Sequence, residues 1–256
     1  NVGGQLAPPI KKAGYDLVAF VGKASNPVYV VIDDDDVRIV DAPELWGKGV
    51  RETEDTIKGA LDGTGWQLAS IGPAGENGVA FSCVVTDKER AAGRGGGGAA
   101  MGSKNLKAVA VRGSNGIEIA DPEAFLEAVG TANAEIAGST GTQEFAEFSS
   151  ISLLPFSNEF GFFPVENFKD GSTSRAESIS AAAHESRVWM RHWACAGCPI
   201  HCGKMGMIKR GPHAGTVCDN VEYESVGLLG GNLRIHSVEN LSFINQTCDK
   251  LGLDTI

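Results

Sequence analysis

The stretch Ile117-Glu-Ile-Ala-Asp-Pro-Glu-Ala-Phe-Leu126 marks a change in the secondary structure that the sequence predicts. Asp121 belongs to the residue types that cap helix N-termini, and proline is favoured at the following position. Apolar residues then recur at helical spacing from Glu123 to Ile136. Before residue 119, apolar residues instead fall in short runs that are typical of strands. We therefore predict a domain boundary between residues 118 and 119.

The residues before this boundary alternate between turn residues and runs rich in Val and Ile. Four aspartates at 33–36 separate two such runs, which predicts a hairpin with a polar tip. A calcium loop is the alternative for these carboxylates, but the glycine and the distal glutamate of such a loop are missing. We expect strands at 15–21, 27–32, 37–40, 67–71, 79–85, 108–111 and 117–119, and a helix at 50–61.

The residues after the boundary favour helices at 123–136, 226–233 and 238–251. A loop-rich stretch is expected at 155–171, and residues 149–161 read as a loop that either shapes a substrate pocket or simply covers the domain. The predicted fold class is therefore α+β. A mainly β-sheet domain covers residues 1–118, and a mainly α-helical domain covers residues 119–256.

Composition narrows the class of protein. The chain has 256 residues, of which 42% are hydrophobic and 21% charged, as a packed globular protein requires. Its net charge of −10 argues against nucleic acid or an anionic membrane surface as the main partner. No apolar run approaches the roughly 20 residues of a membrane helix. The chain starts in a Gly-Gly turn without Met, so we expect it to be a piece of a longer protein.

A cluster of cysteines is the strongest local signal. Cys195-Ala-Gly-Cys198-Pro-Ile-His-Cys202 is a C-x2-C-x3-C array, and a bound cation or cluster would remove the repulsion among its thiolates. An iron–sulfur cubane would take a fourth cysteine, either Cys83, Cys218 or Cys248 or one outside the chain. Zinc would recruit His192 or His201. Buried free thiols are the third interpretation, and we favour it for Cys218 and Cys248.

A glycine run follows two arginines in the sheet half. Residues 90–98 read Arg-Ala-Ala-Gly-Arg-Gly-Gly-Gly-Gly, and glycine makes up 34 of the 256 residues. Gly93, Gly95 and Gly98 formally match G-x-G-x-x-G, but that fingerprint requires a strand directly before it and a helix opening in it, which the sequence does not predict here. Exposed backbone amides beside arginines can instead cradle a phosphate.

Two acidic segments are ambiguous when read alone. Glu222-Tyr-Glu224 enters a predicted helix, where the helix dipole favours carboxylates in any case. Asp249-Lys-Leu-Gly-Leu-Asp254 reads as an ordinary helix end with a glycine stop.

Taken in order, these motifs resemble one family. The chain is similar to the tungsten-containing aldehyde:ferredoxin oxidoreductases nearly from end to end, from the middle of their first domain to the start of their second. The motifs that carry the resemblance are Gly14-Tyr-Asp16, Ile71-Gly-Pro-Ala-Gly-Glu-Asn77, Arg90 to Gly96, Met101 to Val111, the cysteine array, Glu222 to Glu224, and Asp249 to Asp254.

The resemblance implies a tungsten or molybdenum bispterin centre beside a [4Fe–4S] cluster. Cys195, Cys198 and Cys202 correspond to three cluster ligands, and Glu224 to the catalytic carboxylate, with Glu222 as the fallback. The backbone carbonyls of Asn1 and Ala91 correspond to ligands of the magnesium that joins the pterin phosphates. The positions that correspond to pterin and phosphate contacts are Gly3, Arg90, Ala92, Gly93, Asp249, Leu253 and Asp254.

The activity implied is oxidation of aldehydes to carboxylic acids, with electrons passing through the cluster to ferredoxin. The resemblance also implies a cytoplasmic enzyme, either a homodimer or a complex with electron-transfer subunits. An aryl-CoA reductase of the benzoyl-CoA type is the alternative within the same architecture, and a zinc-stabilised binding module is the alternative from a different class. Substrate, reaction direction and the choice of metal stay open.

Overall fold

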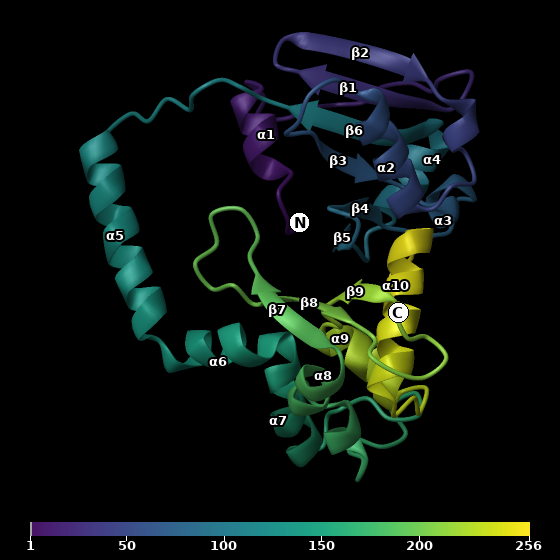
Figure 1. Cartoon of the computed structure of the whole chain (residues 1–256), viewed down its shortest axis with the longest axis vertical. Coiled ribbons are helices and arrows are strands. Elements are labelled where there is room, and N and C mark those ends of the chain that lie inside the picture. The colour runs from purple at the N-terminus through teal and green to yellow at the C-terminus, as the bar shows by residue number, and fades with distance from the viewer. Residues whose placement is uncertain (1) are drawn as a thin grey trace. The chain divides into compact units, whose positions relative to one another are not determined.

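The computed structural model describes residues 2–256 and divides into two compact units (Figure 1). The first unit comprises Asn1–Glu118 and Thr247–Asp254, and the second comprises Ile119–Gln246 and Thr255–Ile256. One helix, α10 (Val238–Leu251), supplies residues to both units. The last eight residues assigned to the first unit therefore come from the far end of the chain.

The first unit is built on a six-stranded sheet in the order β2-β1-β6-β3-β4-β5 (Figure 1). Strands β1 and β6 pair in parallel, and all other neighbours pair antiparallel. The strands are β1 (Val28–Asp33), β2 (Asp36–Asp41), β3 (Gln67–Ser70), β4 (Val84–Thr86), β5 (Arg90–Ala92) and β6 (Leu106–Arg112).

Both faces of strands β1 and β6 are buried, which explains their nearly continuous apolar sequences. Val28, Val30 and Ile32 of β1 belong to one core cluster, and Tyr29 and Val31 between them belong to another. This separation follows from the two-residue period of a strand. The helices of the unit are α1 (Ala7–Lys12), α2 (Val50–Ala60), α3 (Pro73–Glu76) and α4 (Gly97–Ser103), with a 3₁₀ turn at Pro43–Leu45.

Most expectations for this half are confirmed, and three are wrong. The hairpin with aspartates at its tip is β1–β2, and the helix expected at 50–61 is α2. Residues 15–21 and 117–119 contain no strand, and the run expected at 79–85 shortens to β4. Both edges of β1 are already paired, with β2 and β6, so β1 offers no free edge to residues 15–21.

Strand β6 carries a lysine that is completely buried. The Nζ of Lys107 donates to the backbone carbonyl of Lys48 at 2.7 Å and to the carboxylate of Glu76. The other carboxylate oxygen of Glu76 accepts the backbone N–H of Gly47 at 2.7 Å. Burial lowers the pKa of Lys107, and the hydrogen bond to Glu76 opposes that shift. This ion pair therefore joins α3 and the loop before α2 to the centre of the sheet.

We predict that Lys107→Met destabilises the full-length protein by about 3–5 kcal/mol, because it strands the buried Glu76 carboxylate without its cation. The double variant Lys107→Met/Glu76→Leu should recover much of that loss. The free energy of unfolding, measured with denaturant, checks both results. Lys11→Met is the matched control, since it breaks the exposed pair with Asp16 and should cost about 0–1 kcal/mol. Equal losses for Lys107→Met and Lys11→Met would contradict the prediction.

The second unit is mainly helical, with one small sheet. Strand β8 lies at the centre of that sheet, in the order β7-β8-β9, and all pairs are antiparallel. The strands are β7 (Trp189–Trp193), β8 (Gly203–Met207) and β9 (Val217–Asp219). The helices are α5 (Pro122–Gly138), α6 (Thr140–Phe148), α7 (Leu153–Glu159), α8 (Ala181–Arg187), α9 (Tyr223–Ser225) and the first residues of α10. Two 3₁₀ turns (Ser149–Ser152 and Ala176–Ile179) and a π-helical turn (Val226–Gly231) connect them.

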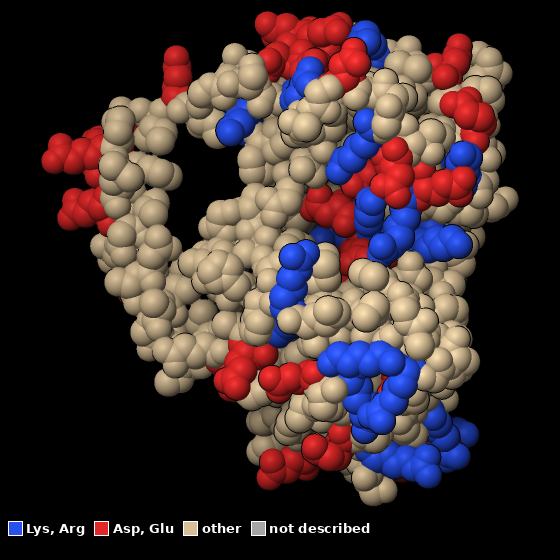
Figure 2. All heavy atoms as spheres, viewed as in Figure 1, with Lys and Arg blue, Asp and Glu red and all other residues tan. Residues whose placement is uncertain are grey.

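A single core cluster holds this unit together, and it includes Ile151, Phe163, Ile208 and Leu241. Helix α5 stands apart from that core and has no buried residue. Figure 2 shows acidic side chains projecting from α5, while Lys and Arg gather on the part of the second unit that holds α8.

The predicted α+β fold class is confirmed. The carboxylate of Asp121 accepts the backbone N–H of Ala124 at 3.0 Å, as a helix cap does. The loop expected at 149–161 is instead a 3₁₀ turn followed by α7. The sheet β7-β8-β9 was not predicted, because its strands are short and their apolar residues do not alternate. None of the helices in residues 2–256 is both long and apolar enough to cross a bilayer.

Candidate functional site

The glycine run lies at the edge of the sheet in the first unit. Strand β5 ends at Ala92, directly before the run, and α4 begins within it at Gly97. The sequence argument that no strand precedes the run is therefore wrong. The dinucleotide fold is nevertheless excluded, because β5 pairs antiparallel with β4 alone and is not a neighbour of β6. The run is a strand-to-helix connection of a different architecture.

The acidic segment at 249–254 packs against this connection. The backbone N–H of Cys83 donates to the carbonyl of Gly252 at 2.8 Å, and that of Asp254 donates to the carbonyl of Phe81 at 3.1 Å. Leu253 and Ser82 also form an isolated antiparallel bridge. Residues some 170 positions apart are thus held side by side within one unit. The sequence offered no sign of this contact.

The close packing requires glycine at particular positions. Gly252 has a φ of +72°, which other residues rarely adopt, and it lies against Gly72. A Cβ on Gly93 would lie 2.8 Å from the carboxylate of Asp254. A Cβ on Gly95 would meet no atom nearer than 3.8 Å, so the backbone there is open to a ligand. The Arg94 guanidinium lies 3.4 Å from Asp254 at the same place.

Two residues at the end of β4, Thr86 within the strand and Asp87 just after it, hold the N-terminal segment in place. The hydroxyl of Thr86 lies 3.3 Å from the carbonyls of both Gly3 and Arg90. The Asp87 carboxylate accepts the backbone N–H of Gln5 at 2.6 Å, and burial raises the pKa of Asp87. Thr86 is 1% exposed. Sequence reasoning missed both residues, because only the tertiary structure shows what they join.

Most of the residues predicted to contact a pterin therefore lie around one edge of the sheet. Gly3, Ala91 and Gly93 are exposed, whereas Asp249 is buried in the last turn of α10. Asn1 lies outside the described residues. Exposed backbone and two arginines suit the flat body and the phosphates of a pterin. The remaining members of the predicted set, Arg90, Ala92, Leu253 and Asp254, are partly buried.

The cysteine array forms the connection between β7 and β8 in the second unit. The backbone N–H of Cys198 donates to the carbonyl of Cys195 at 3.0 Å, and Gly197 has a φ of +68°. Cys195, Cys198 and Cys202 are all partly buried. Three thiols on one tight loop suit a metal cluster that completes its ligands elsewhere. Within residues 2–256, no three Cys, His, Asp or Glu side chains already converge as a metal site.

The base of this loop is fixed by the strands on either side. Lys204, which is 1% exposed, donates to the carbonyl of Ala146 at 2.5 Å and lies 3.0 Å from the Nδ1 of His192. The indole N–H of Trp193 donates to Asp219 at 3.0 Å. A Cβ on Gly203 would lie 2.7 Å from that indole nitrogen. His192, one of the histidines considered for zinc, is therefore already in contact with a lysine.

The other three cysteines lie in different surroundings. Cys218 is completely buried in β9. Burial, followed by the charge of Asp254, raises the pKa of Cys83 to about 11. Burial also raises the pKa of Cys248 in α10 to about 11. Because metals bind thiolates, these shifts disfavour Cys83 and Cys248 as ligands.

The two candidate carboxylates differ in their contacts. Glu222 immediately precedes α9, and it accepts a hydrogen bond from the hydroxyl of Ser150. That hydroxyl also accepts the backbone N–H of Tyr223 at 2.9 Å. Glu224 is the second residue of α9, and its side chain is exposed. The carboxylate of Glu222 is thus occupied by a hydrogen bond that joins it to Ser150, whereas the carboxylate of Glu224 is accessible to a reactant.

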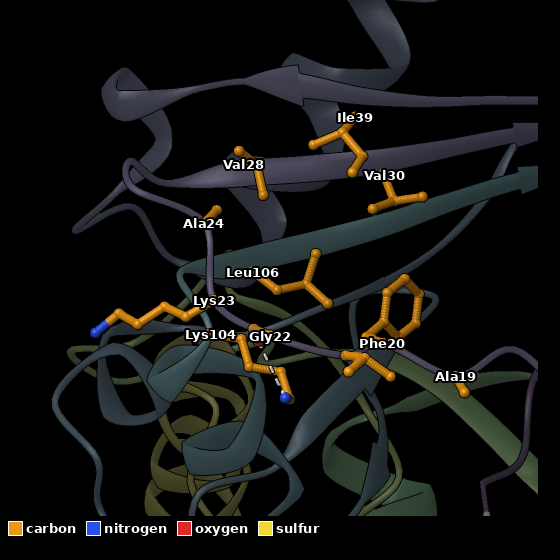
Figure 3. Close-up of a pocket in the computed structure, with 11 residues that line it drawn as sticks. Ala19, Phe20, Gly22, Lys23, Ala24, Val28, Val30, Ile39, Lys104 and Leu106 are labelled. Atoms are coloured by element: carbon orange, nitrogen blue, oxygen red, sulfur yellow. Dashed lines mark hydrogen bonds between the residues drawn. The ribbon is translucent and has the colours of Figure 1, made fainter.

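A separate cavity of about 440 Å³ lies beside strands β1 and β6 of the first unit (Figure 3). Val28, Val30 and Leu106 form its apolar wall, and Phe20 faces them from the segment before β1. The Nζ of Lys104 donates to the carbonyl of Gly22 at 3.1 Å. None of the residues that the sequence predicts as cofactor ligands is among those lining this cavity.

Comparisons with known proteins agree with this arrangement. Residues 1–113 match the aldehyde ferredoxin oxidoreductase N-terminal domain, and residues 127–256 match domains 2 and 3 of that family. The tungsten-containing aldehyde ferredoxin oxidoreductases of Pyrococcus furiosus and Thermococcus kodakarensis are 42% and 40% identical over all of this chain. The chain spans 42% of the length of each.

A solved structure is also similar. It is a chain of the active site complex BamBC of benzoyl coenzyme A reductase, bound to 1,5-dienoyl-CoA. It superposes with a TM-score of 0.77 at 28% identity, over 99% of this chain and 40% of that chain. The matched domains, the identity and the fold together show that the chain belongs to the aldehyde ferredoxin oxidoreductase family, a family of oxidoreductases.

Proposed function

We propose that the protein oxidises aldehydes to carboxylic acids at a tungsten or molybdenum bispterin centre, and that electrons leave through a [4Fe–4S] cluster to a ferredoxin. One observation carries this proposal. The segment Asp249–Asp254 lies against residues 81–83 and the glycine run that follows β5, so both parts of the predicted pterin site meet within one unit. We further propose that the enzyme works in the cytoplasm, as a homodimer or with electron-transfer subunits.

The sheet edge would hold the cofactor through backbone and arginine contacts. When bound, the metal bispterin supplies the two-electron oxidation of the carbonyl carbon. Gly93 and Ala92 would approach the pterin closely because neither carries a bulky side chain. Arg90 would bind its phosphates through charge-assisted hydrogen bonds. The carbonyls of Ala91 and Asn1 would bind the magnesium, while Gly3, Asp249, Leu253 and Asp254 complete the pterin contacts.

The second unit would contribute the cluster ligands and a proton carrier. Cys195, Cys198 and Cys202 would hold three irons of the cluster as thiolates. Glu224 would hold or release a proton at its carboxylate while substrate carbon is oxidised. Its exposure in α9 favours it over Glu222, which Ser150 engages.

An aryl-CoA reductase is the second candidate, and the fold likeness to the benzoyl coenzyme A reductase complex favours it. Assays of the full-length protein with aldehydes and with aryl-CoA thioesters separate the two. Turnover of aldehydes without reduction of aryl-CoA supports the first proposal. The reverse result supports the second.

The contact made by Thr86 is expected to matter for cofactor loading. Thr86→Val removes the hydroxyl that lies between the Gly3 and Arg90 carbonyls, so we predict several-fold lower tungsten content in the purified full-length enzyme. Elemental analysis measures this directly. Thr56→Val is the matched control, because that hydroxyl is exposed and contacts only its own helix. Equal metal content in both variants would contradict the predicted role.

Loss of a cluster ligand should be visible without any assay of activity. We predict that Cys198→Ser abolishes the visible absorbance and EPR signal of the cluster and lowers the iron content of anaerobically purified full-length protein. Cys248→Ala should keep both, because this thiol is partly buried and has a raised pKa. Unchanged spectra for Cys198→Ser would show that the ligand is misassigned. Stoichiometric zinc with neither iron nor tungsten would instead support the zinc-stabilised module.

The carboxylate assignment is tested by turnover. Glu224→Gln should lower kcat by about 10²–10⁴-fold, because general acid–base groups contribute that much, and metal content should not change. Glu185→Gln is the control, since Glu185 is an exposed carboxylate on α8. Normal turnover by Glu224→Gln would show that another group transfers the proton, and Glu222 would be the next candidate.

A further inference from the structure

A polar cavity in the second unit lies outside every site described above. It encloses about 460 Å³ between the loop at 165–175 and the segment that follows the π-helical turn. The side chains that matter here are Arg175, Arg234 and His236, with Ser172, Thr173 and Ser174 beside them. This volume is within the range of small-molecule sites.

The two arginines of this cavity differ in their partners. Arg234 forms an ion pair with Glu166, which also lines the cavity. Arg175 forms no salt bridge with any residue from 2 to 256. Its backbone N–H donates to the hydroxyl of Thr173 at 3.2 Å, which fixes the start of the side chain. One guanidinium is therefore available to a ligand.

The third basic group, His236, is partly buried, and one of its ring nitrogens is shielded from water. The Nδ1 of His236 is buried, and no described residue forms a hydrogen bond with it. Burial lowers the pKa of His236, and the charges of Arg175 and Arg234 lower it further. An unsatisfied buried nitrogen costs about 1–3 kcal/mol, and an acceptor oxygen would remove this cost.

We propose that this cavity binds a phosphate group, either free or carried by a small metabolite. Guanidinium groups match the geometry of phosphate oxygens and can donate two hydrogen bonds at once. Arg175 and Arg234 would each donate to the oxygens, and a neutral His236 would donate from Nδ1. The hydroxyls of Ser172 and Ser174 are close enough in sequence to supply further donors. The site is independent of the redox function proposed above.

Two carboxylates line the cavity, and one of them, Glu166, is already paired with Arg234. Asp170 lines the same cavity, and its charge repels an anion. Removing that charge should strengthen binding, whereas removing Arg175 should weaken it. Opposite effects from two substitutions in one cavity would not arise from a general loss of structure.

Calorimetric titration of the full-length enzyme tests this proposal, with inorganic phosphate and glycerol phosphate as separate probes. We expect at least one probe to bind with a Kd below about 1 mM. Arg175→Gln should raise that Kd by about tenfold to hundredfold, and Asp170→Asn should lower it. If glycerol phosphate binds more tightly than inorganic phosphate, the natural ligand is a phosphorylated metabolite. If the two probes bind equally, the ligand is free phosphate.

The matched control is Arg210→Gln. Arg210 is also exposed, and it lies 3.7 Å from Glu239, outside this cavity. The control should leave the Kd unchanged, and thermal melting should show that all three variants are folded. The proposal is overturned if neither probe binds. It is also overturned if Arg175→Gln and Arg210→Gln have the same effect, or if Asp170→Asn does not strengthen binding.

Discussion

The return of the chain to the sheet at residues 252–254 is the constraint on which the candidate pterin site depends. Two backbone hydrogen bonds and one isolated bridge join this segment to residues 81–83. The approach is possible only because Gly252 adopts a positive φ and because Gly72 and Gly93 leave room. Side chains at these positions would push the segment away from the glycine run and separate the two parts of the site.

Close packing also fixes the base of the cysteine loop in the second unit, the loop that we propose holds the cluster. The loop at 195–202 spans a hairpin whose base is fixed by Trp193 and Gly203 in van der Waals contact and by a buried lysine. Burial lowers the pKa of Lys204, while the neighbouring charge of Cys202 opposes that shift. Regular strand pairing on both sides thus holds a loop that has little regular structure of its own.

Basic side chains serve different purposes in the two units. Lys107 is satisfied by Glu76 and a carbonyl, so it fastens the sheet of the first unit. The exposed Arg175 forms no salt bridge with the described residues, and the buried Nδ1 of His236 has no hydrogen-bond partner among them, so both groups can donate hydrogen bonds to a ligand. A basic side chain with an ion-pair partner stabilises the fold, whereas one without a partner is a candidate for binding a ligand.

The sequence by itself determined the local elements and the family. Periodicity located α2, α5 and α10 because a helix depends on contacts within one turn, and the order of the motifs indicated the oxidoreductase family. Only the tertiary structure decided that residues 247–254 pack with the first unit, that Thr86 lies between Gly3 and Arg90, and that a small sheet frames the cysteines. These contacts join residues far apart in the chain, and local patterns of apolar residues do not encode such pairings.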